Sequence, residues 1–148
     1  MTNSLILTAG AALVLAACVH TTPPQYIAMP GSTARPFSAA VIANGMIYLA
    51  GQLGIDSSGK VAPGGIGPET KAALENVRAL LAQQGATMSD VVKCTVMLAD
   101  IQEWGAMNTV YMTFFPKNPP ARSAFGTSGL ALGGRVEIEC MAAVPEKK

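Results

Sequence analysis

The chain has 148 residues, half of them hydrophobic, and its 10 Lys and Arg against 9 Asp and Glu leave a formal net charge of +1. This length is that of one ordinary domain with a substantial core. Because the charge is nearly balanced and no Lys/Arg run is interleaved with aromatic residues, the composition disfavours a nucleic-acid-binding groove, and we expect no nucleic-acid partner.

The first 18 residues have the features of a bacterial lipoprotein signal peptide. An apolar run, residues 5–17, is too short to span a bilayer and ends in Leu-Ala-Ala-Cys18, which resembles a lipobox, whose cysteine is lipid-modified and becomes the new N-terminus. We therefore expect a lipid anchor on Cys18 and a location on the periplasmic side of the cell envelope, with Val19 favouring the outer membrane over the inner one. Residues 1–4 contain no Lys or Arg, so an uncleaved extension on a cytoplasmic protein is the alternative.

Residues 19–34 combine Thr, Pro and Gly without hydrophobic periodicity, which predicts a flexible tether. Its 16 residues could reach roughly 50 Å when fully extended. The folded domain is then expected over residues 35–145.

A hairpin and a turn open the expected domain. Asn44-Gly45 lies between two apolar runs, and both residue types accept the positive φ of a tight hairpin turn. We therefore expect two antiparallel strands, one on each side of this pair. Residues 56–59, Asp-Ser-Ser-Gly, predict a second turn, and the Pro- and Gly-rich residues 63–68 predict a connection to a helix.

Two helices and a strand are predicted in the middle of the chain. Over residues 68–84 the apolar positions recur at helical spacing, and the alternating, β-rich run 91–98 predicts a strand reached by a crossover. Asp100, followed by Glu103 three residues later, predicts a capping box that starts a second helix, which a proline ends. The apolar and aromatic stripe of this second helix is assigned to the core: Trp104, Met107, Val110, Tyr111 and Phe114.

The last part of the chain mounts an arginine and predicts a further strand. Pro119 and Pro120 fix the backbone ahead of Arg122, so its guanidinium follows a rigid segment. Residues 135–143 alternate with period two, which predicts a strand with one apolar and one charged face. The apolar face holds Val136, Ile138, Cys140 and Ala142, and the other holds Arg135, Glu137, Glu139 and Met141.

The resulting order is two strands, a helix, a strand, a helix and two strands (ββαβαββ). It predicts an α+β two-layer sandwich in which two helices cover one face of a mixed β-sheet. Because the second face of the last strand is not purely polar, we expect that face of the sheet to be partly buried against other subunits.

Four segments of the sequence stand out together: Asn44-Gly-Met-Ile-Tyr-Leu-Ala-Gly-Gln, Met107-Asn-Thr-Val-Tyr, Pro120-Ala-Arg-Ser and Val136-Glu-Ile-Glu-Cys-Met-Ala. They resemble segments of the Rid family of reactive-intermediate imine deaminases, also called the YjgF family, and the resemblance extends over about residues 35–144. The resemblance implies a chorismate-mutase-like fold and a homotrimer with a site in each intersubunit cleft. It also implies hydrolytic deamination of small enamines and 2-imino acids to 2-oxo acids and ammonia, with no cofactor.

No residues of the sequence fit a nucleophilic triad or a metal site. The only histidine, His20, falls in the predicted tether, and Cys18, Cys94 and Cys140 lack ligand spacing. Cys94 and Cys140 lie on predicted strands among apolar neighbours, which favours two small core residues first and a disulfide second. The strand register cannot be read from the sequence, so their pairing stays open.

An arginine with carboxylates remains, and hydrolysis of an imine needs little more, because a protonated imine already has an electrophilic carbon. Arg122 can hold a substrate carboxylate with two parallel hydrogen bonds, and Glu137 can orient the attacking water and accept its proton. The resemblance assigns these catalytic roles to the two residues and places Asn108 among the substrate-binding residues. The alternative for Arg122 is an intersubunit salt bridge to Glu137 or Glu139.

Three positions depart from the family pattern. Phe37 stands where a Tyr is usual, Ala50 where a Ser is usual, and Ala124 where a Cys is usual. A lost hydroxyl contact is worth on the order of 1 kcal/mol, and the expected pocket becomes more apolar. Phe37 and Ala124 are still expected among the substrate-binding residues, Ala124 through its backbone. The alternative function is therefore a non-catalytic module that binds a small carboxylate or apolar ligand in the same cleft.

Overall fold

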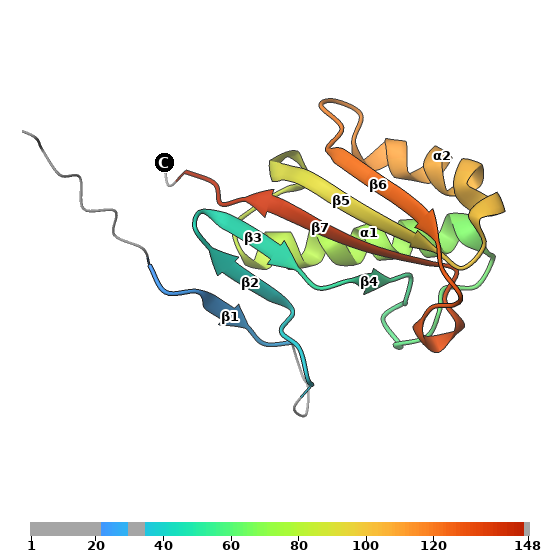
Figure 1. The fold of residues 1–148 in the computed structure, drawn as a ribbon, viewed down its shortest axis with the longest axis horizontal. Coiled ribbons are helices and arrows are strands. Elements are labelled where there is room, and N and C mark those ends of the chain that lie inside the picture. Colours follow the sequence, from blue (N-terminus) through green and yellow to red (C-terminus); the bar gives the residue numbers. More distant parts are fainter. Residues whose placement is uncertain (1–21, 30–34, 147–148) are drawn as a thin grey trace, which may run out of the picture.

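The computed structural model describes residues 22–29 and 35–146, so the predicted signal peptide, with Cys18, lies outside the described part. The strands form a mixed sheet in the order β1-β2-β3-β7-β5-β6, with the short β4 also paired to β7. Both helices lie together on one face of this sheet (Figure 1), which confirms the predicted two-layer α+β sandwich. The bounds are β1 Gln25–Ile27, β2 Ala40–Ala43, β3 Met46–Leu49, β4 Gln52–Leu53, α1 Ile66–Gln83, β5 Val91–Leu98, α2 Trp104–Phe114, β6 Ala121–Gly126 and β7 Val136–Ala143.

The Asn44-Gly45 hairpin forms as predicted. β2 pairs antiparallel with β3, Ala43 lies opposite Met46, and the two turn residues have φ angles of 50° and 75°. Gly45 has no Cβ to oppose such a φ, and Asn tolerates it better than most residues. The turn at Asp56 forms as well, since its Oδ1 accepts from the Ser58 N–H at 2.8 Å.

Part of the predicted tether is folded. Residues 25–27 form β1, which pairs antiparallel with β2, and Tyr26 lies opposite Val41. The prediction of a tether over residues 19–34 is therefore wrong for this segment, and the folded unit begins before residue 35. Without β1, β2 would be an open edge, and an extended segment can satisfy its free N–H and C=O groups without hydrophobic periodicity of its own.

The start of α2 differs from its prediction in one contact. Asp100 accepts from the Gln102 N–H at 2.9 Å, as a capping residue should. Glu103 does not reach back to complete the capping box, because both its carboxylate oxygens accept from the Arg135 Nε–H at 3.0 Å. A charge-assisted hydrogen bond to a guanidinium is stronger than one to a neutral backbone amide, so Glu103 bonds to Arg135 in preference to the Asp100 N–H.

Both helices otherwise form close to their predicted bounds. α1 begins two residues earlier than residue 68 and buries its apolar stripe, and a 3-10 turn, Ile101–Glu103, precedes α2. Among the described residues, neither helix combines the length and the apolarity that crossing a membrane requires.

The register of the central strands settles the cysteine pairing. β5 pairs antiparallel with β7, Cys94 lies opposite Cys140, and the two sulfurs form a disulfide. Both residues are buried in the core beneath the helices. Their expected burial is confirmed, but the preference for two unlinked core residues is corrected, because the antiparallel register places them directly across from each other.

The second face of the sheet is open in the single chain. The predicted alternation of β7 is confirmed, with Val136, Ile138, Cys140 and Ala142 buried on the helix side. Large apolar side chains lie on the opposite side, where Tyr48, Met141 and Phe125 are 40%, 37% and 46% exposed. This face is apolar enough to favour a covering partner.

Candidate active site

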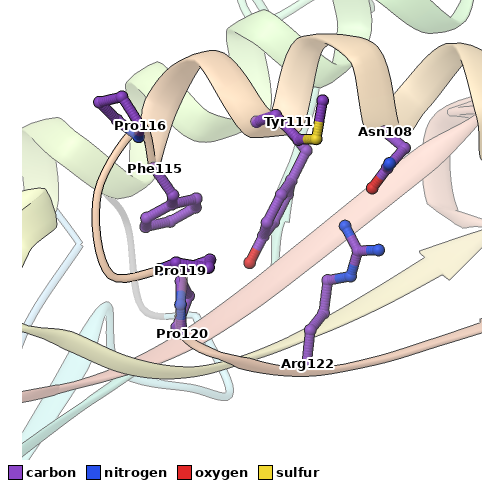
Figure 2. A pocket seen from close by; sticks show the side chains of 8 residues that line it. Asn108, Tyr111, Phe115, Pro116, Pro119, Pro120 and Arg122 are labelled. Atoms are coloured by element: carbon purple, nitrogen blue, oxygen red, sulfur yellow. The ribbon is translucent and has the colours of Figure 1, made fainter.

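A cavity of about 550 Å³ lies between α2 and the start of β6. Arg122 reaches from β6 toward α2, and the end of its side chain lies next to that of Asn108 (Figure 2). The structure thus brings together two of the predicted site residues. The rest of the wall is mostly apolar and includes Met112, Phe115, Pro116, Pro119 and Pro120.

The sheet holds the base of Arg122. β6 begins directly after Pro119 and Pro120 and pairs parallel with β5, so that Arg122 lies opposite Cys94. Since Cys94 is linked to Cys140 of β7, three neighbouring strands are connected along the row that carries the arginine. The rigid mounting predicted from the prolines is therefore reinforced by a covalent link beneath it.

Two aromatic rings of α2 position the guanidinium. The Arg122 Cζ lies 4.5 Å from the ring centroid of Tyr111 and 5.6 Å from that of Trp104. Each such cation–π contact contributes about 0.5–2 kcal/mol. Among the described residues no carboxylate lies within salt-bridge distance of Arg122. The rings therefore orient the guanidinium while its N–H groups stay available to an anion.

The contact of these two aromatic residues with Arg122 was not predicted from the sequence. Their predicted place in the core is right for Tyr111, which is 3% exposed, but wrong for Trp104, which is 43% exposed. One signal could have found them: Trp104, Asn108 and Tyr111 recur at i, i+4 and i+7. This spacing puts an amide and two rings on one stripe of a helix.

The Tyr111 hydroxyl is buried and has no hydrogen-bond partner among the described residues. Burial raises the pKa of Tyr111 to about 12, although the positive charge of Arg122 opposes part of the rise. At neutral pH the hydroxyl is therefore protonated and can donate a hydrogen bond.

Glu137 lies on the opposite face of the sheet from Arg122. Arg122 pairs with Cys94 of β5, whereas Glu137 pairs with Met97, three residues further along the same strand. Since side chains alternate along a strand, the two partners point to opposite faces. In one chain, therefore, Arg122 faces the helices and Glu137 faces the open side, and the two predicted catalytic residues do not meet.

The Glu137 carboxylate packs closely against Gly51, between β3 and β4. A methyl group added at Gly51 would overlap the Glu137 Oε1. This contact is possible only for a residue without a Cβ, so Gly51 lets the carboxylate lie against the backbone.

The remaining predicted positions lie apart from the cavity. Phe37 is 51% exposed and lines a separate hollow of about 410 Å³, where the Arg35 Cζ is 5.9 Å from its ring. Ala124 shares the face of Arg122 and packs against the core, and the Ala50 N–H donates to the Ala39 carbonyl at 3.0 Å. In the described part of the chain, no cluster of His, Cys, Asp or Glu side chains could hold a metal ion.

The sheet order, the paired helices and the arginine cavity define a two-layer α+β protein with a candidate anion-binding site at the edge strand β6. A family model described as endoribonuclease L-PSP matches residues 28–144. The chain therefore belongs to this family, in agreement with the Rid resemblance of its motifs.

Individual relatives agree with this assignment. The chain is 46% identical over 108 residues to a 2-iminobutanoate/2-iminopropanoate deaminase of Capra hircus, which covers 72% of this chain and 79% of the relative. The structure of the Rid-family protein YyfA from Yersinia pestis is 32% identical, with a TM-score of 0.77 over 82% of this chain and all of that one. The YjgF gene product of E. coli is 28% identical, with a TM-score of 0.74 over 82% and 99% of the two chains.

Proposed function

We propose that the protein is a hydrolytic deaminase of small 2-imino acids and their enamine tautomers, which it converts to 2-oxo acids and ammonia. One observation carries the proposal: Arg122 lies against two aromatic rings, in a largely apolar cavity, without a carboxylate partner among the described residues. A guanidinium held this way is suited to a substrate carboxylate. The goat relative, which is named for imine deamination, supports the choice of reaction.

The reaction needs a held substrate and a placed water. The water oxygen adds to the carbon of the protonated C=N bond, and Glu137 accepts the proton that the water loses. Glu137 then returns this proton to nitrogen, the C–N bond breaks, and the hydroxyl oxygen becomes the carbonyl of the 2-oxo acid. The hydroxyl proton leaves with ammonia as ammonium, so one water balances the reaction and nothing is oxidised or reduced.

The proposed site requires more than one copy of the chain. Arg122 and Glu137 face opposite sides of one sheet, so a cleft that contains both must take one from each of two copies. β6, which carries Arg122, is an edge strand and is accessible to a second copy, and the open sheet face offers exposed apolar side chains for association. The proposal is a homotrimer with three such clefts.

Substitution of Arg122 tests the proposed reaction. We expect Arg122→Ala to lower kcat/KM at least about 100-fold, because a bidentate charge-assisted contact is lost. Arg122→Lys should also be impaired, since an ammonium cannot donate the two parallel hydrogen bonds of a guanidinium. The assay follows the decay of 2-imino acids generated by an amino-acid oxidase, with Arg78→Ala on the exposed side of α1 as the matched control. Equal rates for wild type and Arg122→Ala would refute the mechanism.

Ligand-dependent melting, measured together with ammonia release, separates catalysis from binding. If a 2-oxo acid raises the melting temperature of the wild type but ammonia release never exceeds the uncatalysed rate, the protein is a binding module. The loss of polar groups at Phe37 and Ala50 is the reason to measure both quantities.

The proposal includes a place in the cell. A lipid on Cys18 would hold the domain at the periplasmic side of the envelope, at the outer rather than the inner membrane. The support is the sequence of residues 5–19, with its short apolar run and Leu-Ala-Ala-Cys motif.

A further inference from the structure

The Tyr111 hydroxyl is a buried polar group for which the fold supplies no partner. Among the described residues it is the one buried side-chain oxygen or nitrogen without a hydrogen bond. Leaving such a group unpaired costs about 1–3 kcal/mol, and a phenylalanine would fill the same space without this cost. The presence of a tyrosine therefore calls for an acceptor from outside the described chain.

Tyr111 and Arg122 lie side by side in the wall of one cavity. Tyr111 lines that cavity, and its ring is the one that Arg122 contacts at 4.5 Å. Figure 2 shows the Tyr111 side chain running from α2 toward Pro119 and Pro120, with its oxygen at the far end and the guanidinium beside the ring. The neighbouring side chains there, Phe115 and the two prolines, carry no hydrogen-bond acceptor.

An acceptor that occupies this cavity would be anionic. The cation of Arg122 attracts it, and a protonated phenol can only add a donor to the same group at neutral pH. A carboxylate has two oxygens with about four acceptor positions, so it can take two bonds from the guanidinium and a further one from a phenol.

We propose that the Tyr111 hydroxyl donates a hydrogen bond to the substrate carboxylate held by Arg122, which makes Tyr111 a specificity-determining residue for carboxylate-bearing imines. The inference rests on the proposed function for the identity of the substrate, but not for the existence of the carboxylate site. Tyr111 then has two separate roles. Its ring orients the guanidinium, and its hydroxyl favours a carboxylate over a neutral amide, because a hydrogen bond to a charged acceptor is stronger than one to a neutral acceptor.

Tyr111→Phe separates these roles because it keeps the ring and removes only the hydroxyl. The full chain, wild type and variant, is titrated calorimetrically with 2-oxobutanoate and with its neutral amide, 2-oxobutanamide. We expect the variant to bind the carboxylate roughly 10-fold more weakly and the amide only about 3-fold more weakly, because a hydrogen bond to a charged acceptor is about twice as strong as one to a neutral acceptor. In turnover of 2-iminobutanoate, KM should rise by a similar factor while kcat changes less than about 2-fold. Tyr26→Phe, on the edge strand farthest from β6, is the matched control and should leave both affinities unchanged.

Other results would overturn the inference. Equal carboxylate binding by wild type and Tyr111→Phe would mean that the hydroxyl touches no ligand, and a higher melting temperature with unchanged affinity would identify it as an unsatisfied structural group. An equal loss for carboxylate and amide, or a change of oligomeric state without a change in binding, would also contradict it, as would a wild type that binds neither compound. If the wild type binds 2-oxobutanoate but releases no ammonia from the imine, the proposed function fails, while a carboxylate-specific loss in Tyr111→Phe still supports the inference.

Discussion

At the residue scale, the candidate site depends on how Arg122 is oriented. A surface arginine usually finds a carboxylate, as Arg135 does with Glu103. Arg122 instead lies against Tyr111 and Trp104. A substrate carboxylate therefore does not have to displace an internal ion pair, and the aromatic surfaces already fix the direction of the N–H groups.

The prolines before Arg122 are a local feature of the sequence that could identify this residue, whereas Asn108 was predicted only from the family resemblance. Motif and spacing could not identify the Tyr111 hydroxyl as unpaired, since that depends on which atoms surround it after folding. They also could not show that Arg122 and Glu137 face opposite sides of the sheet. That result depends on the register between β5 and its two neighbours, which only tertiary pairing fixes.

The raised pKa of Tyr111 predicts a specific loss of stability at high pH. The folded pKa of Tyr111, about 12, lies above the ordinary tyrosine pKa of 10.0, so the folded state keeps a proton that the unfolded state loses. The contribution of protonated Tyr111 to the free energy of unfolding is fully present below pH 10. It is lost as the pH rises toward 12, and the loss is on the order of 2 kcal/mol. Urea unfolding of wild type and Tyr111→Phe at pH 8, 10 and 11.5 measures it. The stability difference between the two proteins should change in favour of the variant as pH rises, and a constant difference would contradict the prediction.

Gly51→Ala tests the close contact with Glu137. The added methyl group would overlap the Glu137 Oε1, so the carboxylate must move from its present position. We expect kcat to fall about 10-fold or more, because a displacement of about 1 Å in a catalytic group costs up to about 100-fold. Gly105→Ala in α2, where the added methyl group meets no atom within 4 Å, is the control. It should retain activity and gain about 0.5–1 kcal/mol of stability from helix propensity.

At the element scale, the long and periodic segments formed as predicted, whereas the edge strand β1 and the cap before α2 differ from their predictions. The apolar spacing of α1 and the alternation of β7 repeat over several turns or pairs, so a single competing contact cannot change them. β1 has only three residues and exists because β2 offers an open edge. The cap at Glu103 could not be predicted for a similar reason, because its carboxylate bonds to Arg135, which is distant in the sequence, instead of the local backbone N–H.

The disulfide between β5 and β7 predicts a non-additive stability loss. Cys94 and Cys140 are 46 residues apart, and a closed loop of this size stabilises the fold by about 4 kcal/mol in the chain-entropy model. Cys94→Ala alone should therefore lower the free energy of unfolding by about 2–4 kcal/mol, and the double variant should lose little more than either single variant. Denaturant unfolding at one fixed protein concentration measures this. Additive single losses would mean that the sulfurs are not linked.

At the scale of the whole molecule, a shared site predicts recovery of activity from two inactive variants. Arg122→Ala and Glu137→Gln each remove one half of a cleft, so homotrimers of either should be inactive. When equal amounts are unfolded and refolded together, random assortment leaves about a quarter of the clefts with both residues intact. We expect about that fraction of wild-type activity, whereas a site within one chain would give none. Mixing without unfolding is the control.

The proposed lipid anchor on Cys18 predicts a change of location without a change of assembly. When the full chain is expressed in a bacterium that processes lipoproteins, Cys18→Ser should move the protein from the membrane fraction to the soluble periplasmic fraction, because no acyl chain remains. Size-exclusion chromatography should report the same oligomer for both proteins. A wild type recovered from the cytosol with Met1 intact would contradict the location.

The pairing of β1 with β2 also limits how far the domain can stand from such a membrane. With residues 25–27 held in the sheet, six residues, 19–24, connect Cys18 to the folded unit. Their greatest reach is about 20 Å, against the roughly 50 Å of a free segment of 16 residues. An acylated chain would therefore be held with its β1 edge toward the lipid headgroups. It would encounter imino acids at the bilayer surface, as they emerge from it or pass along it, rather than throughout the surrounding fluid.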